Sequence, residues 1–417
     1  MTKAYWRFLL QPDLSLSDAD EPRLVEECRS LLATAARRRL MSDVPLGIFL
    51  SGGIDSSLVL ASLAESQPAS KLSTFTIGFD EPSFDESAHA ATVARHVGSR
   101  HHERRLSIDR ARDLIDNVLE RLDEPLGDAS LLPTYLLSAF AREGVTVALS
   151  GDGGDELFAG YDPFLALAPA AAYSRLMPGW GHVTLRRLVD LLPISHANTS
   201  LDFKLRRALM GMSYSSSMQL PVWMAPLDPA EMRDLFESPL HIEDLYDEAI
   251  GLWESDPRKD PIDRTLEYFT RFYLQDNILT KVDRAAMMCS LESRAVFLDN
   301  DLVEFCRRLP SRFKLRNGVR KYLLKKVART LLPSSIVDRK KKGFGIPLAK
   351  WLQNVPATPP MAPLSGVYLN YARRAFTDHR AGGADHRLFL WSWIVMQTYA
   401  GKNGPTGAQL QQAPASI

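Results

Sequence analysis

Residues 51–57, with the sequence SGGIDSS, place two glycines, three serines and one aspartate directly after a short apolar run. In a loop that joins a buried strand to a helix, glycines let backbone N–H groups turn toward a ligand, and serine hydroxyls add donors at the positive end of the helix. These groups together predict an anion site. Asp55 fits such a site mainly when a divalent cation lies between its carboxylate and a phosphate. The alternative is a glycine-rich turn in which Asp55 only caps the helix.

A second segment repeats this chemistry. Residues 148–161, with the sequence ALSGDGGDELFAGY, again place serine, glycine and aspartate after an apolar strand. Two such loops at the ends of parallel strands should face each other across one crevice, so Asp55 and Asp155 could share a magnesium ion bound to a leaving pyrophosphate. A Walker-type loop is excluded, because the pattern G-x-x-x-x-G-K-[ST] occurs nowhere in the chain.

The elements that would position these loops alternate between strands and helices. We predict strands over 45–50, 72–79, 101–108 and 145–150, and helices over 20–40, 57–65, 85–98, 108–122 and 133–144. This alternation predicts an α/β fold with a doubly wound, mostly parallel sheet of about five strands, covered on both faces, whose ligands bind at the carboxyl ends of the strands.

Past about Tyr161 the pattern indicates helices without intervening strands. Apolar residues recur three and four apart over 203–212, 263–294, 298–310 and 320–333. We therefore predict an α/β core over 21–162, a helical lobe over 163–400 that completes the site, and a disordered tail over 401–417.

Composition narrows the class of partner. The 417 residues carry 50 basic and 50 acidic side chains, so charge does not favour a nucleic acid or a membrane, and a small molecule is the expected partner. We find no apolar run long enough to span a bilayer and no signal peptide. Cys28, Cys289 and Cys306 lie far apart, which favours buried free thiols and a cytoplasmic location.

These motifs resemble a known family. SGGIDSS resembles the pyrophosphate-binding loop of the ATP pyrophosphatase (PP-loop) superfamily. With SGDGGDELFAGY, DEPLGDASLLPTYLLS, LTKVDRAAMMCSLESR and RKKKGFGIPLAKWL, the chain is similar from about Tyr5 to Leu352 to the synthetase (C-terminal) domain of class B glutamine-dependent asparagine synthetases. The resemblance implies an adenine nucleotide alpha hydrolase-like fold and an ATP-dependent, AMP-forming carbon–nitrogen ligase. In that family the aspartate side chain is adenylated with release of pyrophosphate, and ammonia then displaces AMP to give asparagine.

The resemblance also implies residue roles. The residues that would contact ATP or its pyrophosphate are Leu50, Ser51, Gly52, Gly53, Asp55, Ser56, Ser57, Ile77, Ser150 and Gly151. Asp55 and Asp155 would hold Mg²⁺. Lys341 matches the lysine of the family's R-x-K-x-G-F element, which would stabilise charge at the α-phosphate, although a run of three lysines is also typical of a solvated loop. Lys321 would assist at the phosphates or lie on a solvated helical turn.

Asp152 distinguishes branches of the superfamily. Relatives that form β-lactams tend to have tyrosine after Ser-Gly, whereas asparagine synthetases have an acidic residue there, as this chain has. Near an acyl adenylate, Asp152 could accept a proton from ammonium or an amine; otherwise it is a turn-forming aspartate. Asp123, Glu124, Glu292 and Arg294 are further candidates, which would line the acceptor pocket or form a buried ion pair.

The chain also departs from the family. Glutamine-dependent members begin with a glutaminase domain whose nucleophilic cysteine follows Met1, whereas Thr2 follows here and the interdomain Tyr5–Trp6 pair comes at once. We interpret 1–20 as a linker remnant. Ammonia would then be free or come from a separate glutaminase subunit, unless the sequence is a fragment. The sequence leaves open whether the chain forms a homodimer.

A second departure concerns the acceptor. Ala295 and Val296 replace a valine and a proline that the family usually carries beside the presumed acceptor site. Three hypotheses therefore remain. They are asparagine synthesis, amidation of another carboxylate such as a surface polysaccharide uronic acid or a peptide or natural-product precursor, and a non-catalytic nucleotide-binding partner of a full-length synthetase. The pair Asp55 and Asp155 with Lys341 argues against the third.

Overall fold

A computed structural model of the chain describes residues 5–106, 114–197, 200–238, 240–340, 343, 345–354 and 361–403. The chain divides into two compact units, each built from discontinuous segments. The first comprises Met1–Leu106, Thr134–Ala172 and Gly251–Gly343, and the second comprises Ser107–Pro133, Tyr173–Ile250 and Phe344–Ile417. The sequence pattern places a domain boundary after residue 162. The first unit contains segments from both sides of that position.

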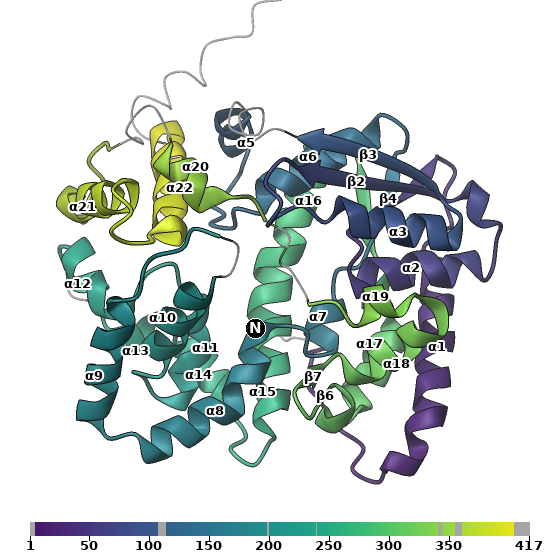
Figure 1. Cartoon of the computed structure of the whole chain (residues 1–417), viewed down its shortest axis with the longest axis horizontal. Helices are drawn as coiled ribbons and strands as arrows, with labels where there is room; N and C mark the ends of the chain where they lie inside the picture. The colour runs from purple at the N-terminus through teal and green to yellow at the C-terminus, as the bar shows by residue number, and fades with distance from the viewer. Residues whose placement is uncertain are drawn as a thin grey trace, which may run out of the picture. The chain divides into compact units, whose positions relative to one another are not determined.

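The first unit contains a parallel sheet of five strands in the order β3-β2-β1-β4-β5. Figure 1 labels β2, β3 and β4 of this sheet. The strands are β1 (Leu46–Phe49), β2 (Ser73–Phe79), β3 (Arg100–Leu106), β4 (Val147–Ser150) and β5 (Glu292–Ala295). A separate antiparallel pair consists of β6 (Leu315–Arg316) and β7 (Val319–Arg320). Because β1 lies between β2 and β4, the loops that follow β1 and β4 leave the same edge of the sheet side by side.

Helices cover both faces of this sheet. The first unit contains the following helical elements. They are η1 (Asp18–Asp20), α1 (Glu21–Arg38), α2 (Ile54–Ala64), η2 (Ala69–Lys71), α3 (Ser87–Val97), α7 (Gly154–Leu157), α15 (Pro261–Tyr268), the π-helix η4 (Phe269–Leu279), α16 (Thr280–Met287), η5 (Val296–Leu298), α17 (Asn300–Arg308), η6 (Ser311–Phe313), α18 (Tyr322–Leu331) and α19 (Ser334–Val337). Residues of α6 (Leu131–Arg142), α8 (Asp162–Leu176) and α14 (Asp247–Glu254) fall in both units.

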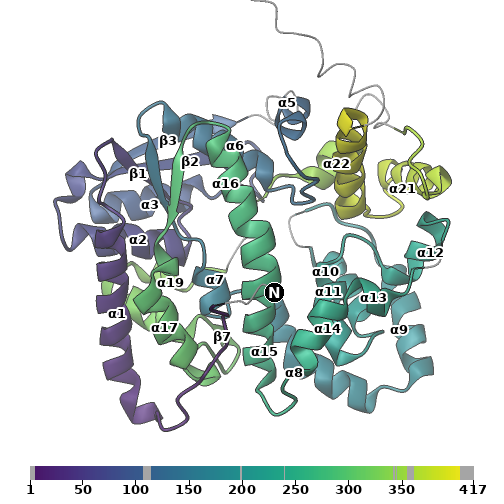
Figure 2. The ribbon, with the colours of Figure 1, turned by 180° about the vertical axis from the view of Figure 1, so that it is seen from behind.

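The main core lies between one sheet face and α1, α2, α17 and α18. In α1, the buried Leu24, Cys28 and Leu32 recur every four residues and so form one apolar stripe along the helix. On the opposite face, Phe140 of α6 packs edge-on against Phe75 of β2, with ring centroids 5.6 Å apart. Figure 2 shows α1 and α6 on opposite sides of the strands. The doubly wound α/β fold predicted from the sequence is confirmed.

The second unit is helical in its described part. Its elements are α5 (Ile115–Glu120), α9 (Gly179–Asp190), α10 (Leu201–Gly211), α11 (Ser216–Met224), η3 (Pro229–Glu231), α12 (Met232–Leu235), α13 (Ile242–Leu245), α20 (Leu348–Gln353), α21 (Leu369–Arg380) and α22 (Arg387–Asn403). Among the described helices, none combines the length and apolar character needed to cross a bilayer.

The prediction of helices without strands beyond Tyr161 is wrong in one important place. The segment 263–294 forms α15, η4 and α16, but its end becomes β5, which pairs with β4 from Val147↔Glu292 to Ser150↔Ala295. This strand has no β-branched or aromatic residue, so its conformation comes from pairing with the open edge of β4 rather than from local preference. Part of the predicted helix over 108–122 lies outside the described residues, and α5 forms its remainder.

Candidate active site

The loop between β1 and α2 requires glycine at position 52. Gly52 has a φ of +69°, in the left-handed region that costs other residues energy. A Cβ atom there would lie 2.5 Å from the backbone nitrogen of Ala90, in the first turn of α3. Both the local conformation and the close approach of α3 therefore exclude a side chain.

Hydrogen bonds inside this loop fix its serines. The Ser51 N–H donates to Ser56 Oγ at 3.2 Å, and the Gly53 N–H donates to Ser51 Oγ at 3.2 Å. The hydroxyl of Ser57 is fully buried and has no hydrogen-bond partner among the described residues. The loop therefore gathers backbone and hydroxyl donors at the N-terminus of α2, which favours an anion there.

The loop after β4 packs directly onto this first loop. A Cβ atom at Gly151 would lie 2.9 Å from the backbone nitrogen of Ser56, and one at Gly154 would lie 2.7 Å from Asp55 Oδ1. Glycine at these two positions allows the loops to touch. The structure thus brings together the two segments that the sequence singled out, although they lie about 100 residues apart.

Lys321 joins the two loops. Its Nζ lies 2.6 Å from Asp55 Oδ1 and 2.7 Å from Asp155 Oδ1. Burial opposes the charge of this lysine, but the carboxylates of Asp155 and Asp55 outweigh that cost and raise its pKa to about 12. Its backbone adopts a left-handed conformation with a φ of +54°, and its N–H donates to Phe158 O at 3.1 Å. Gly160 leaves space for the pair, since a Cβ there would lie 1.9 Å from Asp155 Oδ1.

The donor set fits a divalent cation. Asp55 and Asp155 present their carboxylates to one point, their side chains are each 18% exposed, and a cationic ammonium stands between them. Carboxylate oxygens beside a phosphate are the ligands that Mg²⁺ prefers.

Asp152 lies on the loop after β4, near the polar side chains of Ser150 and Lys281. The Ser150 hydroxyl donates to Asp152 Oδ2 at 2.7 Å. Burial raises the pKa of Asp152, although this hydrogen bond and the ammonium of Lys281 oppose the shift. Lys281 is itself buried, on α16 directly after the π-helix. A carboxylate with a raised pKa is better suited to accept a proton near neutral pH.

Glu156 is a buried carboxylate that sequence reasoning missed. Burial, followed by the neighbouring charge of Asp155, raises its pKa to about 7. The Tyr161 hydroxyl donates to Glu156 Oε1, and the Tyr161 ring packs on Phe269 of the π-helix with centroids 4.8 Å apart. The signal was available in the sequence, because Asp152, Asp155 and Glu156 place three carboxylates within five residues.

Arg339 is the arginine of the R-x-K-x-G-F element, and no role of its own was predicted for it from the sequence. Its guanidinium pairs with Glu86 Oε1 at 2.8 Å, and a Cβ at Gly53 would lie 3.8 Å from Arg339 Nη2. This arginine therefore brings positive charge to the first loop. Lys341, predicted to stabilise the α-phosphate, follows two positions later and lies outside the described residues.

Of the predicted adenosine contacts, Leu50 directly follows β1, and Ile77 lies in the carboxyl half of β2. Both side chains are buried, and the Leu50 carbonyl accepts a hydrogen bond from the Thr76 hydroxyl. Their position at the strand ends agrees with the general placement of ligands in parallel sheets.

Two of the predicted acceptor residues, Glu292 and Arg294, belong to β5 of the first unit. Glu292 pairs in register with Val147, the first residue of β4, so it lies at the opposite end of the strand from the loops. Arg294 Nη1 donates to the carbonyl of Met41 at 2.7 Å and thereby holds the segment before β1. Asp123 and Glu124 belong to the second unit, where both are exposed.

A further group of potential metal ligands lies in the second unit. His196, His379 and Asp385 have ligand atoms within 4.8 Å of one another. Protein groups already use these atoms, since His379 Nε2 contacts Ala349 O at 2.9 Å and Arg387 Nε donates to Asp385 Oδ2 at 2.8 Å. We interpret this group as a structural hydrogen-bond cluster.

Comparison with known proteins identifies a family and several similar proteins. A model of the family described as Asparagine synthase matches residues 27–401. The chain is 27% identical to asparagine synthetase [glutamine-hydrolyzing] 1 of Bacillus subtilis, with 95% of this chain and 62% of that protein covered. It is 29% identical to a putative asparagine synthetase of Mycobacterium tuberculosis (92% and 58%) and 26% identical to Amidase chyE of Penicillium rubens (84% and 56%). The chain thus spans less than two thirds of the length of these relatives.

Proposed function

Because the chain belongs to the asparagine synthase family, we propose that it catalyses ATP-dependent amide formation on a carboxylate. The carboxylate oxygen attacks the α-phosphorus of ATP, the bond to the β-phosphate oxygen breaks, and pyrophosphate leaves. Ammonia then attacks the acyl carbon, and AMP departs. The observation that carries this proposal is the convergence of two glycine loops on Asp55, Asp155 and Lys321 at one edge of the parallel sheet.

The first loop is the proposed pyrophosphate site. The hydroxyls of Ser51, Ser56 and Ser57 and the backbone N–H groups of the first turn of α2 would donate to phosphate oxygens. Asp55 and Asp155 would hold Mg²⁺, which supplies charge neutralisation on the departing pyrophosphate. Lys321 and Arg339 keep further positive charge beside the same loop. This arrangement suits release of pyrophosphate rather than transfer of one phosphoryl group.

Asp152 is the proposed proton acceptor in the second step. Attack by ammonia leaves a positive charge on nitrogen, and one proton must leave as the amide forms. Burial raises the pKa of Asp152, and the Ser150 hydroxyl fixes the orientation of its carboxylate. Lys341 would stabilise the negative charge at the α-phosphate, with the role that the family motif implies.

The side chain of aspartate is the first candidate acceptor, and another carboxylate is the second. The second candidate is favoured by the register of β5, because Ala295 pairs with Ser150. Ala295 and Val296, which depart from the usual family residues, therefore lie beside the proposed nucleotide loop rather than at a distant site.

A pyrophosphate-release assay tests both the proposed catalysis and the class of acceptor. The purified chain is mixed with ATP, Mg²⁺ and ammonium, and with aspartate, glutamate, a uronic acid or a peptide carboxylate in turn. We expect release with one acceptor class and loss of release in Asp155→Asn, whereas Asp162→Asn, at an exposed position in α8, keeps it. ATP binding without release for any acceptor would overturn the catalytic proposal and favour a non-catalytic nucleotide-binding partner.

A further inference from the structure

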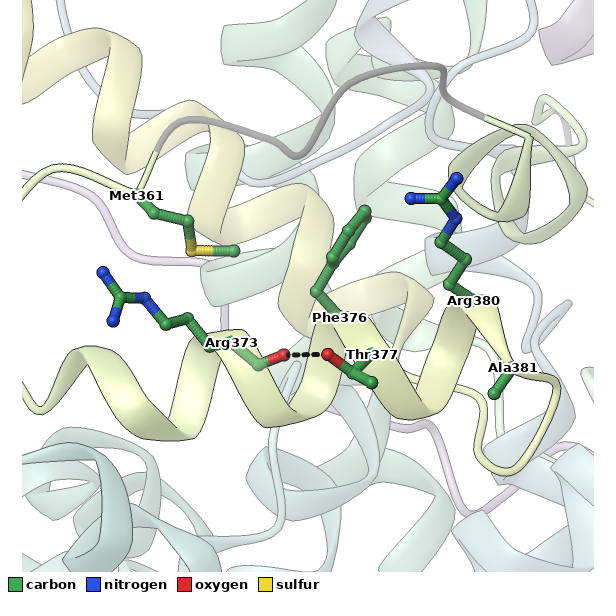
Figure 3. A pocket seen from close by; sticks show the side chains of 6 residues that line it. All are labelled: Met361, Arg373, Phe376, Thr377, Arg380 and Ala381. Carbon is green, nitrogen blue, oxygen red and sulfur yellow. Dashed lines mark hydrogen bonds between the residues drawn. The ribbon is translucent and has the colours of Figure 1, made fainter.

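The second unit carries a pocket along one side of α21 that plays no part in the proposed reaction (Figure 3). Its volume is about 710 Å³, within the usual range for small-molecule sites. The residues that line it are Met361, Arg373, Phe376, Thr377, Arg380 and Ala381. Five of these six come from α21 and its C-terminal end, so one helix face defines the pocket.

Two arginines mark the ends of this face. Arg373 and Arg380 are seven residues apart, so they lie on the same side of α21, separated by two turns or about 10.5 Å along its axis. Phe376 lies between them in Figure 3, and the residue is 5% exposed. The pocket therefore presents an apolar floor between two cationic ends.

The charge of these arginines is not compensated within the described part of the chain. Neither guanidinium has an ion-pair partner there, whereas the adjacent Arg374 pairs with Asp234 at 3.8 Å and lies over the Tyr371 ring. The acidic residue of α21 is Asp378, five residues after Arg373 and therefore about 140° away around the helix. The pocket face thus carries positive charge and no carboxylate of its own helix.

We propose that this pocket binds an amphipathic dianion, a small molecule with an apolar chain and a carboxylate at each end. Each guanidinium can receive one carboxylate in a bidentate pair, which Arg favours over Lys because of its planar fork. Phe376 and Met361 cover the apolar middle. A short dicarboxylate cannot reach both arginines, and a monocarboxylate leaves one of them without an anion.

The two arginines at the ends of the pocket contribute unequally to the affinity for the dianion. Arg380 is the last residue of α21, where free carbonyls give the helix terminus a partial negative charge. That charge attracts the guanidinium and repels an anion bound to it. Arg373 lies two turns away from this end, so it contributes more to the affinity.

Isothermal titration of the full chain with decanedioate, decanoate and butanedioate tests the ligand class. We expect decanedioate to bind about 10-fold more tightly than decanoate, because one charge-assisted pair is lost. Butanedioate should bind at least as weakly as decanoate. Equal affinity for decanedioate and decanoate would overturn the proposal, since an apolar pocket alone would then account for binding.

Three single variants test the assigned residues. Arg373→Gln should weaken decanedioate binding about 10-fold and Arg380→Gln a few-fold, while the matched control Arg374→Gln stays within about 2-fold of the wild type. The first two positions are exposed, so the fold should survive, and thermal melting checks this. An equal loss in all three variants, or none in any, would overturn the assignment. The test needs no turnover, so it stands whether or not amide formation is observed.

Discussion

Lys321 holds its ammonium group between two carboxylates, at the point where the proposed reaction needs a divalent cation. Its Nζ lies within 2.7 Å of an oxygen of both Asp55 and Asp155, and its side chain is 7% exposed. Buried carboxylates repel each other unless a cation compensates them. The lysine therefore stabilises the two loops, and in the proposed reaction Mg²⁺ would add further positive charge at the same carboxylates.

Replacing Lys321 should make the fold depend on the metal. In Lys321→Met the carboxylates of Asp55 and Asp155 lose their shared cation, at a cost of about 3 kcal/mol in the free energy of unfolding. Millimolar Mg²⁺ should recover part of this loss by binding the carboxylates in the folded state. Thermal unfolding with EDTA and with Mg²⁺ measures both effects.

The control is Lys326→Met, which removes a half-exposed partner of Glu21 on α18. Its melting temperature should change little and should not respond to Mg²⁺ beyond the wild-type response. If Mg²⁺ stabilises Lys321→Met no more than it stabilises the wild type, Asp55 and Asp155 do not hold the metal.

Glu156 should make stability depend on pH. Its pKa is about 7 in the folded protein against an ordinary value of 4.5, so between these values the folded state holds a proton that the unfolded chain has released. The contribution of this group is therefore fully present below pH 4.5 and is lost as pH rises through 7, at a total of about 3 kcal/mol. In Glu156→Gln this loss should disappear.

Denaturant unfolding between about pH 5 and pH 8 measures the effect. Glu156→Gln should gain stability over the wild type toward the alkaline end, since it removes a buried negative charge beside Asp155. Glu27→Gln, at an exposed position of α1, is the control and should follow the wild-type curve. Parallel curves for the wild type and Glu156→Gln would contradict the raised pKa.

Lys341 tests the proposed charge stabilisation at the α-phosphate. A cation that acts on charge developed during the reaction contributes more to turnover than to ATP affinity. Lys341→Ala should therefore lower kcat by about 100-fold or more, with a much smaller change in the Kd of ATP. Lys340→Ala and Lys342→Ala are the controls. If all three variants weaken ATP binding alike and leave kcat unchanged, the lysine run acts only through its overall charge.

At the scale of elements, the loop between β1 and α2 depends on a glycine that no other residue can replace. Gly52→Ala would force a side chain into a left-handed conformation and against the backbone of Ala90, at a cost of about 2–4 kcal/mol. We expect loss of pyrophosphate release with a lower melting temperature. Gly251→Ala is the control, because a Cβ there meets nothing within 4 Å and α14 should gain about 0.5–1 kcal/mol. Normal pyrophosphate release by Gly52→Ala would show that the loop need not keep this conformation.

The same loop shows why part of the structure could be predicted. A strand, a glycine turn and a helix leave local signals in apolar runs, turn residues and helix spacing, and these predicted β1, β2, β3, β4 and the fold class. The sequence ESRA of β5 carries no such signal, because the strand forms by pairing with β4. The π-helix η4 was also missed, since its apolar spacing resembles that of an ordinary α-helix.

The candidate site was also predictable only where its residues belong to local sequence motifs. Glycine and aspartate spacing identified both loops, but Lys281 and Arg339 reach them only through tertiary packing. Glu292 and Arg294 were predicted at the acceptor pocket from a motif, and the register of β5 places Glu292 at the far end of the strand. Residues whose position depends on how strands pair leave no local pattern to read.

At the scale of the molecule, the candidate site forms only when distant segments meet. Asp55 and Lys321 are 266 residues apart in sequence, and the first unit collects its three segments around one sheet. Contacts of such separation carry a high cost in chain entropy until the core forms. The site therefore depends on folding of the whole first unit rather than on one local motif.

The source of nitrogen can be predicted from the state of the cysteines. Hydrolysis of glutamine through a cysteine requires a reactive thiolate. Cys28 and Cys306 are fully buried, and burial raises the pKa of Cys28 well above its usual range and that of Cys306 to about 12. The remaining thiol, Cys289, is half-buried, and it donates to the carbonyl of Tyr135 at 3.7 Å.

We therefore expect this chain to use ammonium directly. Pyrophosphate release with the preferred acceptor should rise with ammonium concentration and should not start when glutamine replaces ammonium. Cys289→Ala should leave the ammonium-dependent rate unchanged, because no thiol takes part in either step of the proposed reaction. Glutamate formed from glutamine by the purified chain, and lost in Cys289→Ala, would contradict this argument and would make the half-buried thiol a nucleophile.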